Sequence, residues 1–575
     1  MRAVHTALIS LALLACARLA TAQVGTTKIV SVTSTGAQGF QDSRSASVDE
    51  SGRYVAFVTY SALVPRDSGI QPDVYLRDTI LGTTDRVSEG PNNESGNGVS
   101  FGAEMAKGGL FVVFYSRSSN LVPNDTNNVN DIFIWDRKND SMERVSVAEN
   151  GAEGNGTSYS GSVDRDGTVV AFVSAATNLV DGDNNGVIDV FIADRVANTM
   201  DNITLGANGP SRNPSISADG RFVAFESEAS NLVANDNNDE IDIFMYDRQA
   251  GTIKRVSVSS VGVEANDFSS HPEVNGDGRF VVFSSWASNL IAGDGNQDSD
   301  IFIHDRLIGT TDLISKNREG IQANGYSIEP SISTSGRFVA FVSSANNLNS
   351  GGDFNGHRDI FVRDQITGAV VIASRTDNGS QANDVSQEPS LSGDGRFVAF
   401  DTYARNFGYG DTSSDLDVYL HQQFDIGGPV SYLHHVGLRV GGNLRSLYES
   451  NDDRLVSQPG PVFSTQSWPL VIVFDAVGSI DTPSTLTFEI ESRGSAGTLL
   501  QRIEFFNYVT NSYEEVDSRL ATTSDSLITI SITSNATRFV GPFRGLRARV
   551  SYKATGPVFA YPWSAGIDLI RWTMD

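Results

Sequence analysis

Pairs of aspartates placed six residues apart recur along this chain, and they could form cation sites. The second Asp of each pair opens an expected strand, and an Asn often stands two residues after the first Asp. Carboxylate and amide oxygens on one short loop are ligands that Ca²⁺ favours. The predicted calcium ligands are Asp125, Asn127 and Asp131; Asp183, Asn185 and Asp189; Asp236, Asn238 and Asp242; and Asp294, Asn296 and Asp300. The alternative, which Asp and Asn adopt more often, is that they cap the loop by hydrogen-bonding its backbone.

A second recurring set consists of serines, each three residues before the position that holds Pro214 and Pro330 in the clearest repeats. These serines and the acidic loops are expected on one face, near the mouth of a central channel. We predict that the serines contact a ligand there; the alternative is that they tie neighbouring repeats together. The predicted ligand-binding serines are Ser43, Ser100, Ser158, Ser211, Ser269, Ser327 and Ser386. The remaining aspartate pairs, Asp67/Asp73, Asp353/Asp359 and Asp411/Asp417, would complete a ring of negative charge on this face.

No catalytic residue is predicted. Residues 98–102 match the Gly-x-Ser-x-Gly elbow of hydrolases, but that elbow needs a strand-to-helix turn, and its serine here is one of seven equivalent residues. The histidines lack the spacing of zinc ligands. An enzyme would instead carry its chemistry where the repeats deviate most. Those positions are Glu226, Glu228, Trp286, Asp401, Tyr403 and Arg405.

A repeat of 53 to 59 residues positions these side chains. A phenylalanine marks each copy, at Phe57, Phe114, Phe172, Phe225, Phe283, Phe341 and Phe400. Within the copy at 211–258, apolar runs near Ile216 and at 221–227, 242–246 and 254–258 are separated by Gly-, Asp- and Asn-rich turns, which predicts four strands. A repeat of this length must stack on its neighbours to bury its apolar faces. Four strands per repeat without a helical period predict a propeller blade.

The ends of the array predict how the ring closes. The seventh copy lacks a fourth strand after residues 417–420, whereas an unmatched strand of that type stands at Lys28–Val32. Pairing Lys28–Val32 with Val418–His421 would remove two exposed strand edges. The predicted fold is therefore all-β: a seven-bladed β-propeller, with the N-terminal strand closing the last blade, followed by a C-terminal antiparallel β-sandwich.

The motif Pro-Ser-Ile-Ser-x-x-Gly-Arg-Phe-Val-Ala-Phe, at 214–225 and again at 330–341, resembles the WD40-like PD40 repeats of TolB-like β-propellers. The resemblance spans residues 28–424 and implies a propeller. Similar blades occur in prolyl oligopeptidase-like peptidases and in some polysaccharide lyases, so the resemblance leaves the function open. TolB-like propellers usually have six shorter blades, and TolB has an N-terminal domain that is missing here.

The expected domains are a signal peptide at 1–22, the propeller at 23–424, a linker at 425–429 and the β-sandwich at 430–575. The basic start, the short apolar run and a small-x-small site before Gln23 predict secretion or export to a bacterial periplasm or surface. Lipidation at Cys16, the only cysteine, is the alternative. In the β-sandwich, Trp468, Trp563 and Trp572 would form either a sugar-stacking platform or core packing.

The chain has 575 residues, a formal net charge of −27 and a pI near 4.6. Such a charge argues against nucleic-acid partners, and no segment is apolar enough to predict a transmembrane span. We expect a secreted binding or scaffold protein whose acidic propeller face recognises a protein or glycan, with Ca²⁺ as a possible cofactor. The alternatives are a polysaccharide lyase or hydrolase acting at the channel mouth, and a structural surface protein. The oligomeric state is left open.

Overall fold

The computed structural model describes residues 26–67, 71–349, 351–365, 368–408, 414–423, 431–436, 438–441, 455–458, 470–477, 485–494, 499–510, 512–524, 526–540, 545–554 and 565–574. The predicted signal peptide with Cys16, the predicted linker, Asp411, Trp468 and Trp563 lie outside these residues. The chain divides into two compact units, residues 1–423 and 424–575, and each is described by itself. Among the described residues, no helix has the length and apolar character that crossing a bilayer requires.

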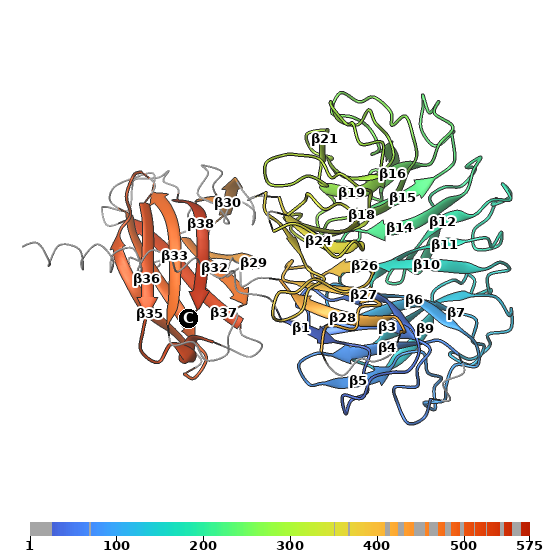
Figure 1. The fold of residues 1–575 in the computed structure, drawn as a ribbon, viewed down its shortest axis with the longest axis horizontal. Helices are drawn as coiled ribbons and strands as arrows, with labels where there is room; N and C mark the ends of the chain where they lie inside the picture. Colours follow the sequence, from blue (N-terminus) through green and yellow to red (C-terminus); the bar gives the residue numbers. More distant parts are fainter. Residues whose placement is uncertain are drawn as a thin grey trace, which may run out of the picture. The chain divides into compact units, whose positions relative to one another are not determined.

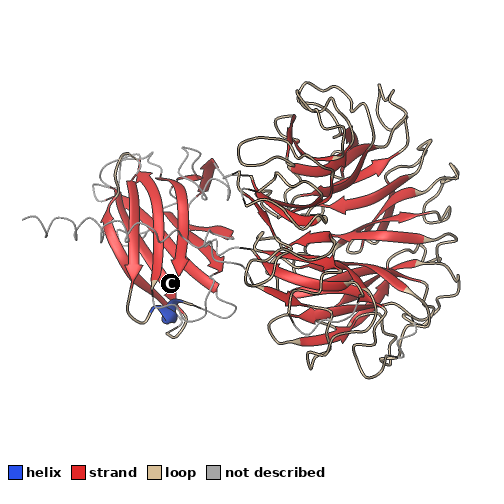
Figure 2. Cartoon of the chain, viewed as in Figure 1, coloured by secondary structure: helices blue, strands red, loops and turns tan. Residues whose placement is uncertain are grey.

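Seven four-stranded antiparallel sheets, the blades, form the first unit and are arranged one after another around it (Figures 1 and 2). Blade 1 comprises β2 (Ser43–Val48), β3 (Tyr54–Thr59), β4 (Asp73–Asp78) and β5 (Thr83–Arg86). Blade 2 comprises β6 (Ser100–Met105), β7 (Phe111–Ser116), β8 (Asp131–Asp136) and β9 (Ser141–Arg144). Blade 3 comprises β10 (Ser158–Val163), β11 (Val169–Ser174), β12 (Asp189–Asp194) and β13 (Thr199–Asn202). Blade 4 comprises β14 (Ser211–Ile216), β15 (Phe222–Ser227), β16 (Asp242–Asp247) and β17 (Thr252–Arg255).

The remaining blades repeat the pattern. Blade 5 comprises β18 (Ser269–Val274), β19 (Phe280–Ser285), β20 (Asp300–Asp305) and β21 (Thr310–Leu313). Blade 6 comprises β22 (Ser327–Ile332), β23 (Phe338–Ser343), β24 (Asp359–Asp364) and β25 (Val370–Ile372). Blade 7 comprises β26 (Ser386–Leu391), β27 (Phe397–Thr402), β28 (Asp417–Gln422) and β1 (Thr27–Ile29). The predicted seven-bladed fold is confirmed.

The N-terminal strand closes the ring, as predicted. Strand β1 pairs antiparallel with β28, with Lys28 opposite Leu420. The backbone N–H of Val30 continues the ladder by donating to the Val418 carbonyl at 2.8 Å. Because β1 supplies the outer strand of blade 7, the first and last parts of the propeller sequence share one sheet.

The second strand of each blade is apolar on both faces because the blades stack face to face. In β15, all six residues are buried, so the strand shows no alternation of buried and exposed side chains. Its Phe225 stacks on Phe244 of β16 with the ring centroids 5.8 Å apart, and the recurring phenylalanine makes an aromatic pair of this kind in every blade. Aromatic pairs across neighbouring strands stabilise a sheet beyond the area that they bury.

The outer strand lies earlier in the sequence than predicted. In blade 4 it runs from Thr252 to Arg255, whereas the prediction was 254–258. The Ser257 hydroxyl, just past the strand, donates to Asp242 and accepts the Ile243 N–H at 3.1 Å. In the Arg-Val-Ser motif, the arginine therefore ends the outer strand, and the serine caps the start of the third strand.

The second unit is a β-sandwich, as predicted, of two five-stranded sheets among the described residues. One sheet has the order β29 (Ser431–Val436), β32 (Leu470–Val477), β37 (Gly545–Ala554), β34 (Leu499–Asn507) and β35 (Ser512–Leu520). The other has the order β30 (Leu438–Gly441), β31 (Leu455–Gln458), β38 (Ala565–Met574), β33 (Leu486–Gly494) and β36 (Ser526–Ile532), and a 3₁₀ helix, η2 (Ala536–Phe539), follows β36. Trp572 is 2% exposed and packs on Phe488 and Phe505 of the shared core, so the sugar-platform reading is wrong for this residue.

Candidate functional site

The first strands of neighbouring blades contact one another and form the channel wall. Each of them carries a β-bulge, because its register against the second strand shifts between the second and fifth residues. The third residue of the strand has a positive φ, between 49° and 63°. These bulge residues are Ser45, Gly102, Ser160, Asn213, His271, Glu329 and Glu388. A bulge redirects a side chain, and a non-glycine residue at positive φ persists only where the surrounding structure holds it.

All seven bulge residues line one cavity of about 390 Å³. The lining also includes the two residues that follow each bulge residue, together with Lys107, Ala218, Gly276 and Thr334 of the hairpins between first and second strands. The cavity therefore lies toward the hairpin end of the channel, away from the acidic loops, which connect second and third strands. Identical positions in the fold carry hydroxyl, amide, imidazole and carboxylate groups, so the cavity lacks the sevenfold symmetry of its wall.

A ring of hydrogen bonds joins the blades around this cavity. The residue two positions after each bulge residue accepts a backbone N–H from the first strand of the next blade. For example, Ser47 accepts the Met105 N–H at 2.9 Å, and Ser390 accepts the Val48 N–H at 3.2 Å across the junction between blades 7 and 1. The acceptors are Ser47, Glu104, Ser162, Ser215, Glu273, Ser331 and Ser390.

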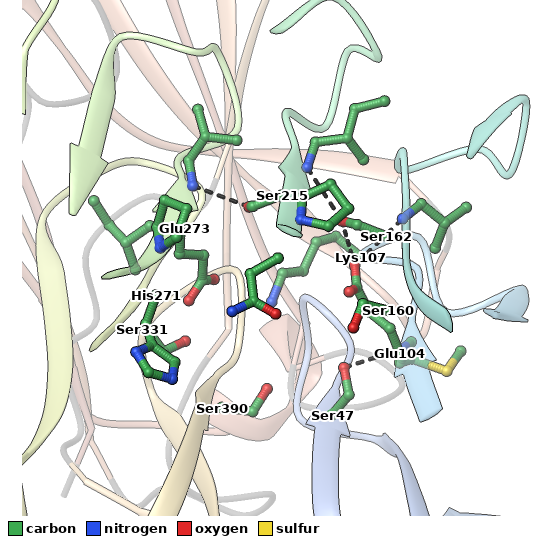
Figure 3. Close-up of a pocket in the computed structure, with 18 of the residues that line it drawn as sticks. Ser47, Glu104, Lys107, Ser160, Ser162, Ser215, His271, Glu273, Ser331 and Ser390 are labelled. Atoms are coloured by element: carbon green, nitrogen blue, oxygen red, sulfur yellow. Dashed lines mark hydrogen bonds between the residues drawn. The ribbon is translucent and has the colours of Figure 1, made fainter. Parts of the chain in front are cut away.

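Two members of this ring are glutamates. Figure 3 shows the Lys107 side chain between Glu104 and Glu273. Burial raises the pKa of Glu104 to about 7, although the Ser162 hydroxyl, the Val163 N–H and the Lys107 charge act against this shift. Burial also raises the pKa of Glu273, again opposed by Lys107. The Lys107 ammonium donates to the Leu391 carbonyl at 3.1 Å. A protonated and an ionised carboxyl group can therefore coexist in the cavity near neutral pH.

Two acidic residues behind the wall hold the bulges in place. Asp401 of β27 is fully buried, and it accepts the Ser45 N–H at 2.8 Å, as does Glu388 at 3.1 Å. Burial and the nearby Glu388 carboxylate raise the pKa of Asp401 well above its usual value. Glu226 of β15 accepts the amide of Asn213 and the backbone N–H of His271, both at 3.0 Å. Asp401 and Glu226, which deviate from the repeat in sequence, thus support the cavity from behind.

The seven predicted ligand-binding serines do not line this cavity, and that prediction is wrong. Each is 0% exposed. Each hydroxyl lies 2.8 to 3.1 Å from a Ser or Thr hydroxyl at the end of the second strand in the same blade. They do lie at the acidic-loop end, as predicted. Each hydroxyl joins two strands of one blade, while each backbone N–H donates to a carbonyl just before the third strand of the preceding blade, which supports the alternative that these serines tie neighbouring repeats together. These serines are Ser43, Ser100, Ser158, Ser211, Ser269, Ser327 and Ser386.

The acidic loops show a pattern of internal caps. The third-strand aspartates, exemplified by Asp131, are at most 2% exposed. The Asn127 amide nitrogen donates to Asp131 at 2.8 Å, while the Asn127 oxygen accepts the Val129 N–H at 3.2 Å. The other predicted asparagine ligands, Asn185, Asn238 and Asn296, make the same two bonds with Asp189, Asp242 and Asp300 and with the loop backbone. These bonds fit the alternative, in which the asparagines cap the loop.

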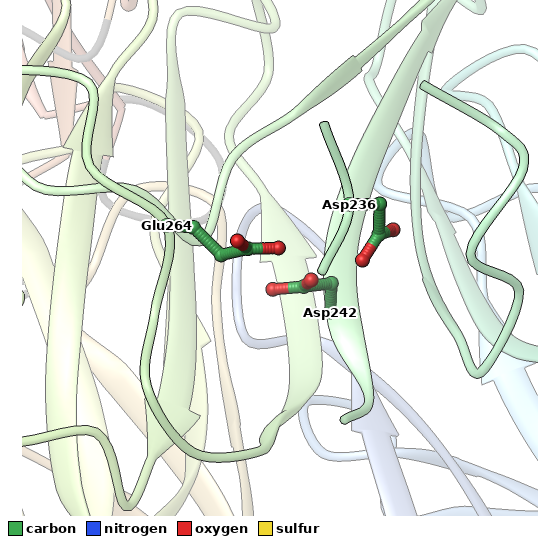
Figure 4. A group of neighbouring side chains, drawn as sticks. All are labelled: Asp236, Asp242 and Glu264. Carbon is green, nitrogen blue, oxygen red and sulfur yellow. The ribbon is translucent and has the colours of Figure 1, made fainter. Parts of the chain in front are cut away.

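Arginine takes the place predicted for Ca²⁺ in blades 2 and 4. Figure 4 shows Asp236, Asp242 and Glu264 facing one another. The Arg255 guanidinium lies 3.2 Å from Asp236 and 3.0 Å from Asp242, and it also contacts Glu264. Arg144 does the same in blade 2 with Asp125, Asp131 and Glu153. In blade 5 the Gln322 amide bridges Asp294 and Asp300, at 2.8 and 2.7 Å.

Sequence reasoning missed the bulge residues and the residues that bridge the aspartate pairs of blades 2, 4 and 5. The bulges give no Gly or Asn signal, since Glu329 and Glu388 occupy two of them. The bridging residue did leave a signal. In blades 2 and 4, Arg at the end of the outer strand accompanies Glu nine residues later, whereas in blade 5 Leu313 accompanies Gln322.

The chain resembles known proteins in structure but not in sequence. No family model matches the sequence, and no curated protein sequence matches it. Solved structures that resemble it include an oligogalacturonate lyase in complex with manganese (12% identity, TM-score 0.42, 67% of this chain and 90% of that chain). Others are a putative TolB from Agrobacterium tumefaciens (14%, 0.31, 48% and 80%) and the Dos1 propeller (11%, 0.35, 70% and 95%). At these identities the likeness concerns the fold alone. The first unit is a seven-bladed β-propeller with a polar central channel.

Proposed function

We propose that the chain is a secreted binding protein that takes a ligand with amine and hydroxyl groups, such as an amino-sugar unit of a glycan, into the channel cavity. The observation that carries this proposal is the convergence of seven bulge residues, of five residue types, on one cavity. A purely structural ring would need no such variety at equivalent positions. The acidic-loop face, which the sequence favoured as the recognition surface, is less suitable because its carboxylates are largely bonded to the protein itself.

The charge of the cavity favours a cation. Its lining contains Glu104, Glu273, Glu329 and Glu388, against the single lysine Lys107 and one histidine. In a narrow channel with low-dielectric walls, such an excess of one sign attracts the opposite charge more strongly than an open surface does. The same excess disfavours uronates, which carry a carboxylate on every sugar.

The neutral lining groups suit hydroxyls. Ser160 and Asn213 are bulge residues with groups that both donate and accept hydrogen bonds. A volume of about 390 Å³ falls in the range of small-molecule sites and admits one or two sugar units. Secretion, which the sequence of residues 1–22 supports, would expose the channel to extracellular glycans.

The test is calorimetric titration with three sets of oligosaccharides: glucosamine, N-acetylglucosamine and galacturonate. We expect the glucosamine set to bind best and the galacturonate set not to bind. Glu388→Gln keeps one acceptor oxygen for Ser45 but removes the charge, and it should weaken glucosamine binding about tenfold or more. Glu319→Gln changes an exposed glutamate outside the cavity and is the matched control. Preferential galacturonate binding, or equal affinity in Glu388→Gln and the wild type, would refute the proposal.

A second candidate, a glycan hydrolase, is favoured by the carboxyl pair in the cavity. Glu104, with a pKa of about 7, suits a general acid, and Glu273 suits a base or nucleophile. Incubation with the same oligosaccharides, followed by quantification of new reducing ends, tests it. An enzyme would release reducing ends and lose this activity in Glu104→Gln, whereas a binding protein would retain the oligosaccharides intact.

A further inference from the structure

We propose that blade 3 holds a divalent cation of the Ca²⁺ class between Asp183 and Asp189. In blades 2 and 4, an arginine guanidinium occupies the equivalent position between the two aspartates. The proposed site is independent of the channel ligand, since it lies in the loop between β11 and β12, at the opposite end of the blade from the hairpins that line the cavity.

The blades serve as internal controls because their registers are identical. The last residue of the outer strand pairs with the phenylalanine of the third strand: Arg144 with Phe133 in blade 2, and Arg255 with Phe244 in blade 4. In blade 3 the residue in this position is Asn202, opposite Phe191. The aspartate pair is retained in blade 3 while the cationic partner is replaced by a neutral amide.

The replacement leaves one buried oxygen without a donor. Asp183 is 8% exposed, and none of the described residues donates to its Oδ1 atom. The equivalent Oδ1 atoms of Asp125 and Asp236 lie 3.2 Å from arginine, and that of Asp294 accepts from Gln322 at 2.8 Å. In blades 2, 4 and 5, an arginine or a glutamine amide therefore contacts the Oδ1 atom that, in Asp183, has no donor among the described residues.

The two aspartates of blade 3 differ in how fully the protein bonds them. Asp189 accepts from the Thr204 hydroxyl at 2.7 Å and from the Asn185 amide at 3.0 Å, so its oxygens already have donors. The only bond to Asp183 from the described residues is a long one, 3.3 Å, from the Asn202 amide.

The groups around the Oδ1 atom of Asp183 suit a hard divalent ion. Two carboxylates supply oxygens and two negative charges, and Asp181 and Gly182 leave the loop exposed to water. Ca²⁺ tolerates an irregular shell completed by carbonyls and water, whereas Mg²⁺ demands a stricter octahedron.

The experiment uses the full chain, stripped of metal with a chelator and titrated with CaCl₂ by calorimetry and thermal melting. We expect saturable binding of one ion and a higher Tm in the wild type, with a weaker response to MgCl₂. Asp183→Asn should abolish both effects. Asn202→Arg should also abolish Ca²⁺ binding, yet it should raise the Tm in chelator, because arginine would fill the site as it does in blades 2 and 4.

The matched control is Asp236→Asn, which alters an arginine-filled loop and should leave the calorimetric Ca²⁺ affinity unchanged. Absence of binding heat in the wild type would overturn the proposal. So would a calcium affinity that is unchanged in Asp183→Asn or Asn202→Arg, or one that is lost in Asp236→Asn.

Discussion

The acidic residues of the propeller differ in what neutralises them. Asp242 is met by the Ser257 hydroxyl and by Arg255, whereas Glu104 depends on burial and a raised pKa. Asp183 has one oxygen that no described residue meets. The number of acidic residues therefore overstates the negative charge that the propeller presents to solvent. What distinguishes a candidate site is the balance of donors around each carboxylate, which composition cannot reveal.

The pKa of Glu104 predicts a pH-dependent stability. A carboxyl group whose pKa rises on folding stabilises the folded state below its unfolded pKa, and this contribution is lost as the pH rises through the folded pKa. For Glu104 the window runs from about pH 4.5 to about pH 7. Glu104→Gln keeps an acceptor for the Val163 N–H and cannot ionise. Relative to the wild type, its free energy of unfolding should therefore increase over this window by up to about 3 kcal/mol.

Urea denaturation at pH 5, 6, 7 and 8 measures this difference. Glu319→Gln, an exposed position, should follow the wild type at every pH. A constant offset between Glu104→Gln and the wild type across these values would mean that Glu104 ionises normally in the folded protein.

At the scale of strands and turns, blade stacking depends on glycines in the hairpins between first and second strands. Gly278 of blade 5 has a φ of +69°, and a Cβ there would overlap the Phe222 ring of blade 4. Gly278→Ala should lower the free energy of unfolding by about 1–2 kcal/mol for the left-handed backbone and about 1–3 kcal/mol more for the overlap.

Gly309 of the same blade isolates the second contribution. Its φ is +66°, but no heavy atom lies within 4 Å of the added Cβ. Gly309→Ala should therefore cost only the backbone strain. Equal losses of stability in the two variants, measured by chemical denaturation, would show that Phe222 moves aside freely and that this glycine is not needed for stacking.

The sequence predicts the elements better than it predicts the site. The spacing of Phe225 and its counterparts identifies the blades, because stacked blades require the same apolar strand in each copy. The serine at Ser211 recurs just as regularly, yet regularity indicates a shared structural task and not a ligand. The bulge at Asn213 is what turns side chains into the channel. A shift of one residue in register reverses which side chain faces the channel, and a bulge leaves no fixed residue type in the sequence.

At the scale of the whole molecule, the propeller is closed in two places. On the outer side, β1 completes blade 7. Around the channel, the seven-membered ring of hydrogen bonds passes from blade 7 to blade 1 through Ser390 and the Val48 N–H. The inner ring of hydrogen bonds forms only when all seven blades are in position. The outer strand, β1, joins blade 7 to the start of the chain. The cavity, which all seven blades line, therefore requires closure to exist.

The outer closure can be tested at Lys28, whose side chain is exposed. The Val30 N–H donates to the Val418 carbonyl and the Gln422 N–H donates to the Thr26 carbonyl, both at 2.8 Å. Hydrogen-bonded pairs alternate along an antiparallel ladder, so Lys28 and Leu420 form the bonded pair between them. Lys28→Pro removes this N–H and leaves the Leu420 carbonyl unpaired, whereas Lys28→Ala keeps the backbone bond. We expect Lys28→Pro to lower the Tm of the propeller and to speed amide exchange in β28 and β27, with exchange in the β-sandwich unchanged and Lys28→Ala close to the wild type. Unchanged exchange in β28 of the Pro variant would show that the inner ring alone holds blade 7, and that β1 covers an edge without closing the fold.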